Sequence, residues 1–146
     1  MTLLHSVMLP MELAGRYSPL ERRERAAHLL EAVGLAKHLN KLPSRVSGGQ
    51  QQRAAIARAI ANDPPLLLGD EPTGNLDSHS AQIVFDLFAT LASEDKTILM
   101  VTQDQALAAK TGRQLELREG LLVRDTMRGF AGATTEKNLP HLAGLL

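Results

Sequence analysis

Two adjacent carboxylates, Asp70 and Glu71, follow the apolar run at residues 66–68 after a single glycine. Such a run predicts a strand buried on both faces, and ligands of open α/β sheets bind beyond the carboxyl ends of the strands. Because side chains alternate along a strand, we expect the two carboxylates to point in different directions. One can hold Mg²⁺, usually through water, and the other can orient or deprotonate an attacking water. For an Asp-Glu pair taken alone, a helix cap or a surface turn is the simpler interpretation.

A second candidate site lies at Ser47, Gly48, Gly49 and Gln50. Serine followed three residues later by glutamine predicts a capping box, so a helix begins here with free amide groups at its start. The glycines lack Cβ atoms and let a ligand approach the backbone closely, and the serine hydroxyl adds a donor. This arrangement suits the terminal phosphate of a nucleotide. For this segment taken alone, an ordinary capped turn is the simpler interpretation.

In combination and in this order, the segments strongly resemble the ATP-binding-cassette (ABC) ATPases. Residues 46–50 match the signature motif of that family, residues 66–71 match Walker B and residues 72–77 match the D-loop. Val46 replaces the leucine that is usual in the signature motif. The run Asp-Glu-Pro-Thr-Gly-Asn-Leu-Asp is similar to the subfamily that serves lipoprotein-release, macrolide-export and cell-division transporters. The resemblance covers roughly residues 1–124.

The resemblance implies a site that is shared between two subunits. In that family Asp70 would be the carboxylate on the Mg²⁺ side, Glu71 the catalytic carboxylate and Asp77 a member of the loop that communicates across the dimer. Four signature residues would contact the γ-phosphate of ATP bound to the opposite subunit: Ser47, Gly48, Gly49 and Gln50. The implied cofactors are therefore ATP and Mg²⁺. The implied partners are a second ABC ATPase subunit and an integral membrane permease.

The 146 residues contain no Gly-x-x-x-x-Gly-Lys-Ser/Thr run, which is the loop that grips nucleotide phosphates in this family. The aromatic residue that stacks on adenine and the Gln-loop that senses the transport partner are also missing, as in an ABC ATPase truncated at its N-terminus. We therefore expect the isolated chain to bind ATP weakly or not at all, and to be inactive alone. Missing sheet strands would leave exposed edges and apolar faces, so the chain is expected to be unstable, to dimerise or to need a complementary fragment.

A fourth difference from the family lies at Gln103, between Thr102 and Asp104. After the strand at residues 98–101 the family pattern is Thr-His-Asp, and its histidine touches the γ-phosphate and helps to hold the attacking water. Gln103 can donate a neutral hydrogen bond, but it cannot carry a proton or a positive charge. Losing a transition-state contact of this kind typically costs about 2–4 kcal/mol.

The helices are predicted from caps and apolar spacing. The Ser-Pro-Leu-Glu run at residues 18–21 predicts a helix start with a capping box, and Gly34 predicts the end of that helix. An apolar helix at residues 3–13 is expected to end or kink at Pro10. Further helices are predicted at residues 47–62, 78–93 and 104–110.

Strands that alternate with helices predict an α/β fold with a mainly parallel sheet. Buried strands are expected at residues 66–68 and 97–102, and paired strands at residues 114–118 and 121–124. By resemblance this is a partial P-loop NTPase-type domain with two parts. These parts are a helical subdomain with the signature motif at about residues 1–62, and the Walker B, D-loop and switch part of the core at residues 63–125. The C-terminal tail, residues 126–146, has no clear periodicity and stays unassigned.

The composition excludes several classes of protein. Sixteen basic and sixteen acidic residues cancel, so no nucleic-acid partner is expected. With no cysteine, disulfides and thiolate metal sites are excluded. The apolar runs are too short to span a bilayer, and the N-terminus does not look like a signal peptide. We therefore expect a cytoplasmic protein that is held at the inner face of the cell membrane by a permease.

Three hypotheses for function follow. The first is an ATP-binding, ATP-hydrolysing subunit of an ABC transporter of export or lipoprotein-release type. The second is a non-catalytic interaction protein that lends its signature face to a full-length ATPase, or docks on a permease. The third, an ABC-type ATPase of DNA repair, ranks low because the sequence has no sustained heptad repeat.

Overall fold

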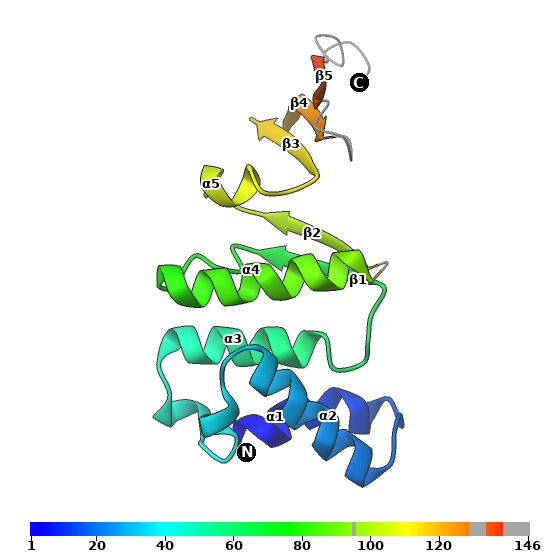
Figure 1. The fold of residues 1–146 in the computed structure, drawn as a ribbon, viewed down its shortest axis with the longest axis vertical. Coiled ribbons are helices and arrows are strands. Elements are labelled where there is room, and N and C mark those ends of the chain that lie inside the picture. Colours follow the sequence, from blue (N-terminus) through cyan, green and yellow to red (C-terminus); the bar gives the residue numbers. More distant parts are fainter. Residues whose placement is uncertain (95, 129–133, 139–146) are drawn as a thin grey trace. The chain divides into compact units, whose positions relative to one another are not determined.

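The computed structural model describes residues 1–94, 96–128 and 134–138, and the chain divides into two compact units, Met1–Val101 and Thr102–Leu146. The elements of the first unit are, in order, α1 (Leu3–Leu13), α2 (Pro19–Ala32), the short 3-10 helices η1 (Ala36–His38) and η2 (Pro43–Arg45), α3 (Gly48–Ala59), β1 (Leu66–Asp70), α4 (Ser78–Ser93) and β2 (Thr97–Val101) (Figure 1). The elements of the second unit are α5 (Gln105–Ala108), β3 (Arg113–Arg118), β4 (Leu121–Arg128) and β5 (Thr134–Asn138).

The first three helices form a layer with its own hydrophobic core, which we call the helical layer. On α1 the buried residues Leu3, Val7 and Met11 recur every four residues and make one apolar stripe. Helix α3 contributes mainly alanines, and Ala57 is fully buried. Small side chains let α3 approach its neighbours closely, as its alanine-rich sequence predicts. The core residues of this layer are Leu3, Leu4, Val7, Met11, Ala26, Leu29, Leu30, Val33, Leu35, Ala54, Ala57, Ile60 and Ala61.

The predicted cap of α2 is confirmed. The Ser18 hydroxyl accepts from the Glu21 amide at 3.3 Å, and the Glu21 carboxylate accepts from the Ser18 amide at 2.7 Å. The same bond from the Ser18 amide holds the pKa of Glu21 below its usual value. The helix ends before Gly34, whose φ of +72° is the left-handed conformation that glycine adopts easily.

Helix α1 is expected to end or kink at Pro10; it does not end there, because it continues to Leu13, and the kink stays a prediction. A proline inside a helix removes one amide donor, but its carbonyl can still accept. The Pro10 carbonyl accepts from the Ala14 amide at 3.1 Å and from the side-chain amide of Asn62 at 2.9 Å. This tie to α3 and the packing of α1 in the core stabilise the helix past the proline.

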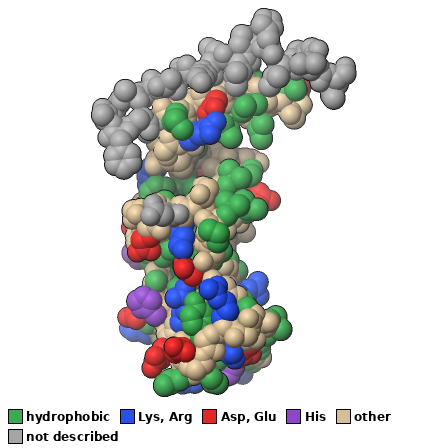
Figure 2. All heavy atoms as spheres, turned by 90° about the vertical axis from the view of Figure 1, so that its right-hand side faces the viewer, with side chains coloured by type: hydrophobic (Ala, Val, Ile, Leu, Met, Phe, Trp, Pro, Cys, Tyr) green, Lys and Arg blue, Asp and Glu red, His purple; other side chains and the backbone are tan. Residues whose placement is uncertain are grey.

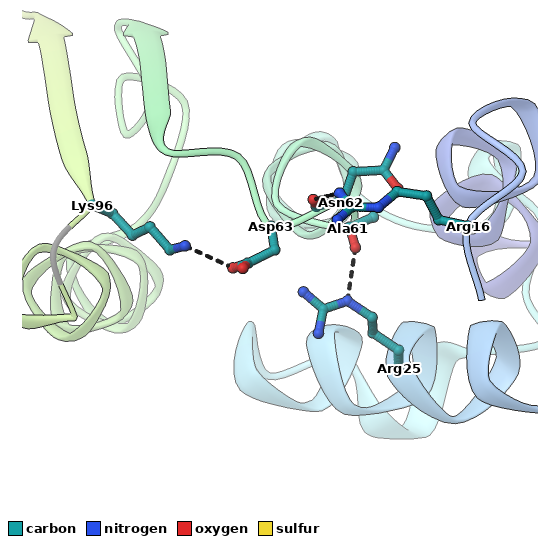
Figure 3. Close-up of polar contacts among 6 residues, drawn as sticks. All are labelled: Arg16, Arg25, Ala61, Asn62, Asp63 and Lys96. Atoms are coloured by element: carbon teal, nitrogen blue, oxygen red, sulfur yellow. Dashed lines mark hydrogen bonds and ion pairs between the residues drawn. The ribbon is translucent and has the colours of Figure 1, made fainter.

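Helix α3 ends at Ala59, slightly before the predicted end, and two arginines satisfy the carbonyls that follow it. The Arg25 side chain donates to the Ala61 carbonyl at 2.7 Å, and Arg16 donates to the Asn62 carbonyl at 2.6 Å (Figure 3). Cations are favourable at a helix C-terminus, where unpaired carbonyls gather. These bonds tie the end of α3 to α2 and to the loop before it.

An ion pair continues this connection to the sheet. Lys96, just before β2, lies 3.0 Å from the Asp63 carboxylate, just before β1 (Figure 3). The bond from Lys96 holds the pKa of Asp63 below its usual value. The two strands therefore begin from a common point, and Leu66 is aligned with Thr97.

Strands β1 and β2 pair in parallel, as predicted, but the prediction that both faces are buried is wrong. One face carries the half-buried Leu67, which packs against the helical core. The other face, which we call the outer sheet face, exposes 49% of Leu66, 72% of Leu68, 52% of Leu99 and 62% of Val101. Only two strands pair in this sheet among the described residues, and no described helix buries these four side chains. Exposed hydrophobic side chains are also visible as green patches on the view in Figure 2.

The second unit is a three-stranded antiparallel sheet, with β4 between β3 and β5. The predicted hairpin is confirmed: Arg118 pairs with Leu121, and Glu119 and Gly120 form the turn with positive φ values of 52° and 78°. Strand β4 extends past the predicted end, and β5 lies in the tail that the sequence left unassigned. No helix of the described chain is long and apolar enough to cross a membrane.

Candidate nucleotide site

The signature segment forms the start of α3. The Ser47 hydroxyl accepts from the Gln50 amide at 3.3 Å, and the Gln50 side-chain oxygen accepts from the Ser47 amide at 3.0 Å, so the predicted capping box is present. The Gln50 side-chain nitrogen also lies 3.3 Å from Nε2 of His38, in η1. These bonds hold the side chains of Ser47 and Gln50 at the exposed start of the helix, where the first amide groups have no intrahelical acceptor.

The two glycines of this segment have different surroundings. A Cβ atom added at Gly48 would meet nothing within 4 Å, so that side of the backbone is open to a ligand. A Cβ added at Gly49 would lie 3.2 Å from a methyl group of Leu76 and 3.6 Å from the Asn75 carbonyl oxygen. Gly49 therefore lets α3 pack closely on the loop between β1 and α4, a role the sequence did not indicate.

Asp70 is the last residue of β1, and it is exposed beside Val101 at the end of β2. Glu71 follows outside the strand with a φ of +44°, a left-handed conformation that is uncommon for residues other than glycine. Its amide donates to the Val101 carbonyl at 2.9 Å, and its carbonyl accepts from the Gly74 amide at 3.1 Å. The two carboxylates therefore lie at the carboxyl ends of parallel strands, where ligands of α/β sheets bind.

Gln52 joins the two segments and was missed by sequence reasoning. Its side-chain nitrogen donates to the Glu71 carbonyl at 3.1 Å and to the Pro72 carbonyl at 2.7 Å. It reaches this loop from the second turn of α3, 19 residues earlier in the chain. Nothing in the sequence indicates this contact, because Gln52 is one of three consecutive glutamines and its half-burial is known only from the structure.

Asp77 caps α4. Its carboxylate accepts from the Ser80 amide at 2.9 Å and from the Ser80 hydroxyl at 2.8 Å. These bonds, first that from the amide and then that from the hydroxyl, hold the pKa of Asp77 below its usual value. A carboxylate at a helix N-terminus is also favoured by the helix dipole. The observed geometry is thus a helix cap, and the exchange across a dimer that the resemblance implies stays a prediction.

Gln103 belongs to the second unit and follows β2 directly. Within its unit it borders a hollow of about 410 Å³ together with Asp104, Glu116 and Arg124. Asp104 caps α5 by accepting from the amides of Ala106 and Leu107. The role predicted for Gln103 at the γ-phosphate stays a prediction.

The described residues contain no group of three His, Cys, Asp or Glu side chains that could enclose a metal ion. In nucleotide sites Mg²⁺ is held by only one or two carboxylates, together with water and phosphate oxygens, and the residues present fit Mg²⁺ in this way alone. The exposed Asp70 carboxylate can serve as such a ligand. A hollow of about 570 Å³ between α2 and α4 has neither Ser47 nor Glu71 in its lining.

Comparison with known proteins agrees with these motifs. A family model described as "ABC transporter" matches residues 2–74, which include the signature segment, Asp70 and Glu71. The chain belongs to the ABC transporter ATP-binding family. It is 47% identical over 137 residues to the lipoprotein-releasing system ATP-binding protein LolD 1 of Chlorobium chlorochromatii, covering 92% of this chain and 56% of that protein. It is 50% identical over 123 residues to LolD of Gluconobacter oxydans, covering 84% and 53%.

Solved structures confirm the fold. The dimeric structure of MJ0796, a bacterial ABC transporter cassette, superimposes with a TM-score of 0.82 at 42% identity, covering 89% of this chain and 58% of the cassette. A post-hydrolysis state of the same cassette, bound to ADP and Pi, also gives a TM-score of 0.82 at 41% identity. The predicted partial ABC ATPase domain is therefore confirmed. The chain spans about half the length of the curated relatives it matches, with shares of 53% to 56%.

Proposed function

We propose that this chain acts as part of an ATP-binding subunit of an ABC transporter of the lipoprotein-release or export type. The observation that carries the proposal is the meeting of three motifs in one unit. The start of α3 packs on the loop that joins β1 to α4, through Gly49 against Leu76 and through Gln52 against Glu71. These contacts tie the start of α3, the proposed phosphate site, to the loop that carries Glu71, the proposed catalytic carboxylate.

In the proposed reaction, ATP hydrolysis takes place between two subunits. The start of α3 binds the γ-phosphate of ATP held by the opposite subunit through Ser47, Gly48, Gly49 and Gln50. Glu71 orients or deprotonates the water that attacks the γ-phosphate of ATP on its own subunit, and Gln103 donates a neutral hydrogen bond there. Asp70 would be a ligand of Mg²⁺, which neutralises the charge that develops on the phosphate oxygens.

The proposed partners follow from a site that is shared between two subunits. A second ABC ATPase subunit holds the ATP whose γ-phosphate the start of α3 contacts. A membrane permease holds the subunit at the inner face of the cell membrane and selects the transported molecule. The relatives named as lipoprotein-releasing system proteins favour lipoproteins as that molecule.

A second candidate function is a non-catalytic interaction protein that lends its signature face to a complete ATPase. One observation favours it: Gln103 stands where the family has histidine. Under this alternative Ser47 to Gln50 still act, but Glu71 serves no nucleotide. We expect the isolated chain to bind ATP weakly or not at all; a micromolar affinity in a fluorescent-nucleotide titration of the monomer would contradict this.

The experiment mixes this chain with an intact family ATPase whose own signature serine has been replaced by arginine. Restored ATP hydrolysis is expected, because Ser47 supplies the missing contact in trans. The Ser47→Arg form of this chain should not restore activity. Ser44→Arg, an exposed serine in η2, is the matched control and should restore it. No restoration by the unaltered chain would contradict the proposed function.

The same mixture separates the two candidates. For this test, a separate fragment that carries the phosphate-gripping loop of a family ATPase is added to the mixture. If Glu71 is catalytic for ATP on its own subunit, Glu71→Gln then lowers the restored turnover. If the chain only lends its signature face, Glu71→Gln leaves the restored rate unchanged in every mixture.

A further inference from the structure

The backbone of Glu71 is held in an unfavourable conformation by contacts from three segments. Its φ of +44° is left-handed, and such conformations persist only where the surroundings over-determine them. The amide of Glu71 donates to Val101 on β2, and its carbonyl accepts from the Gly74 amide within the turn. The third contact is the Gln52 side chain, which comes from α3 in the helical layer.

The contact from Gln52 needs a hydrogen-bond donor. Its side-chain nitrogen donates both to Glu71 at 3.1 Å and to Pro72 at 2.7 Å, so its position is defined by two consecutive carbonyl groups. Its side-chain oxygen is buried and has no hydrogen-bond partner among the described residues. A buried amide normally satisfies both ends, and here only the donor end is used. The site therefore selects for the donor rather than for a polar residue in general.

We propose that Gln52 is a positioning residue that fixes the Glu71–Pro72 backbone and thereby aims the Glu71 carboxylate. The catalytic meaning of this aim rests on the proposed function. Because the direction of a side chain follows from the φ and ψ of its own residue, releasing the Glu71 carbonyl changes where the carboxylate points.

The same contact links two nucleotide sites. Helix α3 begins with Ser47–Gln50, which face the ATP of the opposite subunit in the proposed dimer, and Gln52 lies in the next turn. A shift of α3 when the signature segment meets a γ-phosphate is therefore carried to Glu71, which serves the other ATP. The signature segment and Gln52 move together because they lie on one helix, and a packed helix is stiff.

Amide hydrogen exchange in the full chain tests the contact without any nucleotide. Gln52→Met has similar length but no donor, so it removes both hydrogen bonds to the loop. It should speed the exchange of the Glu71 and Gly74 amides about fivefold or more, since the loss of even one neutral hydrogen bond corresponds to about fivefold. Gln51→Met, an exposed position on the same helix, is the matched control and should leave both rates unchanged. Protection of α1 and α2 amides reports whether each variant is folded.

Gln52→Glu adds a test that a merely structural role would not pass. A carboxylate facing two carbonyls loses both hydrogen bonds, whereas the protonated acid can donate one. After correction for intrinsic exchange, the Gly74 amide of this variant should exchange several-fold faster at about pH 7 than at about pH 3, which lie on either side of the ordinary glutamic acid pKa, while Gln52→Met stays flat. Wild-type rates in Gln52→Met, or a flat profile in Gln52→Glu, would overturn the proposal.

A final arm separates this inference from the proposed function. Adding an intact, ATP-loaded family ATPase should change the exchange of the Glu71 and Gly74 amides in the wild-type chain, and Gln52→Met should abolish that change without preventing association. If Gln52→Met associates with the ATPase and its Glu71 and Gly74 amides still change their exchange rates, the link between the two sites is overturned. Failure of the wild-type chain to associate contradicts the proposed function, and the exchange rates of the isolated chain still decide the role of Gln52.

Discussion

The helical layer and the outer sheet face lie in the same unit, yet they differ in how completely they are buried. In the helical layer Val7, Met11 and Leu30 are fully buried. On the outer sheet face Leu68 is 72% exposed and Val101 is 62% exposed, although both belong to strands with a regular parallel register.

The difference teaches that regular secondary structure and burial have separate causes. The core of the helical layer is assembled from segments between residues 3 and 61, which pack on one another. Strands β1 and β2 satisfy each other's hydrogen bonds, but an apolar sheet face needs a further layer to cover it. Among the described residues the helical layer therefore has a core of its own, whereas the outer sheet face is left uncovered in a chain that spans about half the length of its relatives.

The largest expected effect comes from making the same substitution in both regions. Leu30→Ala removes a fully buried side chain and should lower the free energy of unfolding by about 2–5 kcal/mol. Leu68→Ala should change it by less than about 0.5 kcal/mol, because that side chain is already exposed. Urea denaturation followed by circular dichroism measures both. Equal losses would show that the outer sheet face is covered in solution and would remove the contrast.

The second prediction concerns self-association. If two chains associate through the outer sheet face, Leu68→Lys should raise the dissociation constant of that self-association about tenfold or more. Leu13→Lys is the matched control, because Leu13 is 81% exposed at the end of α1 but lies in the helical layer. Sedimentation velocity distinguishes the two variants. A similar change in both, or a wild-type chain that stays monomeric at all concentrations, contradicts the assignment of this face.

The third prediction asks how far the helical layer depends on its caps. Ser18→Ala removes the acceptor of the Glu21 amide and should lower the free energy of unfolding by about 1 kcal/mol. Ser44→Ala, at an exposed serine in η2 with no cap to provide, should have almost no effect. Thermal denaturation of the three proteins measures the difference. An unchanged Ser18→Ala protein would mean that packing alone holds α2.

The smallest expected effect concerns α4 and depends on pH. Because the pKa of Asp77 is lowered in the folded chain, its cap contributes stability that is present above the unfolded pKa, about 4, and is lost as the pH falls through the folded value. Asp77→Asn keeps a capping group that does not titrate. Urea midpoints between about pH 5 and pH 2 should fall less steeply in the variant, and parallel curves would contradict the role of this carboxylate.

Prediction succeeded where a feature depends on residues close together in the chain. The capping boxes at Ser18 and Ser47 each need only a partner three residues later, and both are present. The pattern at Pro10 was misleading because a contact from Asn62, far along the chain, supports the helix there. The burial expected for Leu68 was wrong for a similar reason, since it depends on a layer that the strand itself does not contain.

The sequence by itself determined the family, the order of the motifs, the helix starts and the carboxylates that carry the proposed chemistry. These follow from residue type and short spacing, because hydrogen bonds within one helical turn or one strand end are local. Only the tertiary structure decided that Gly49 packs on Leu76, and that Gln52 holds the backbone of Glu71. Both contacts join α3 to a loop well beyond it in the chain, and only the packing of the helical layer against the strands brings those groups within reach.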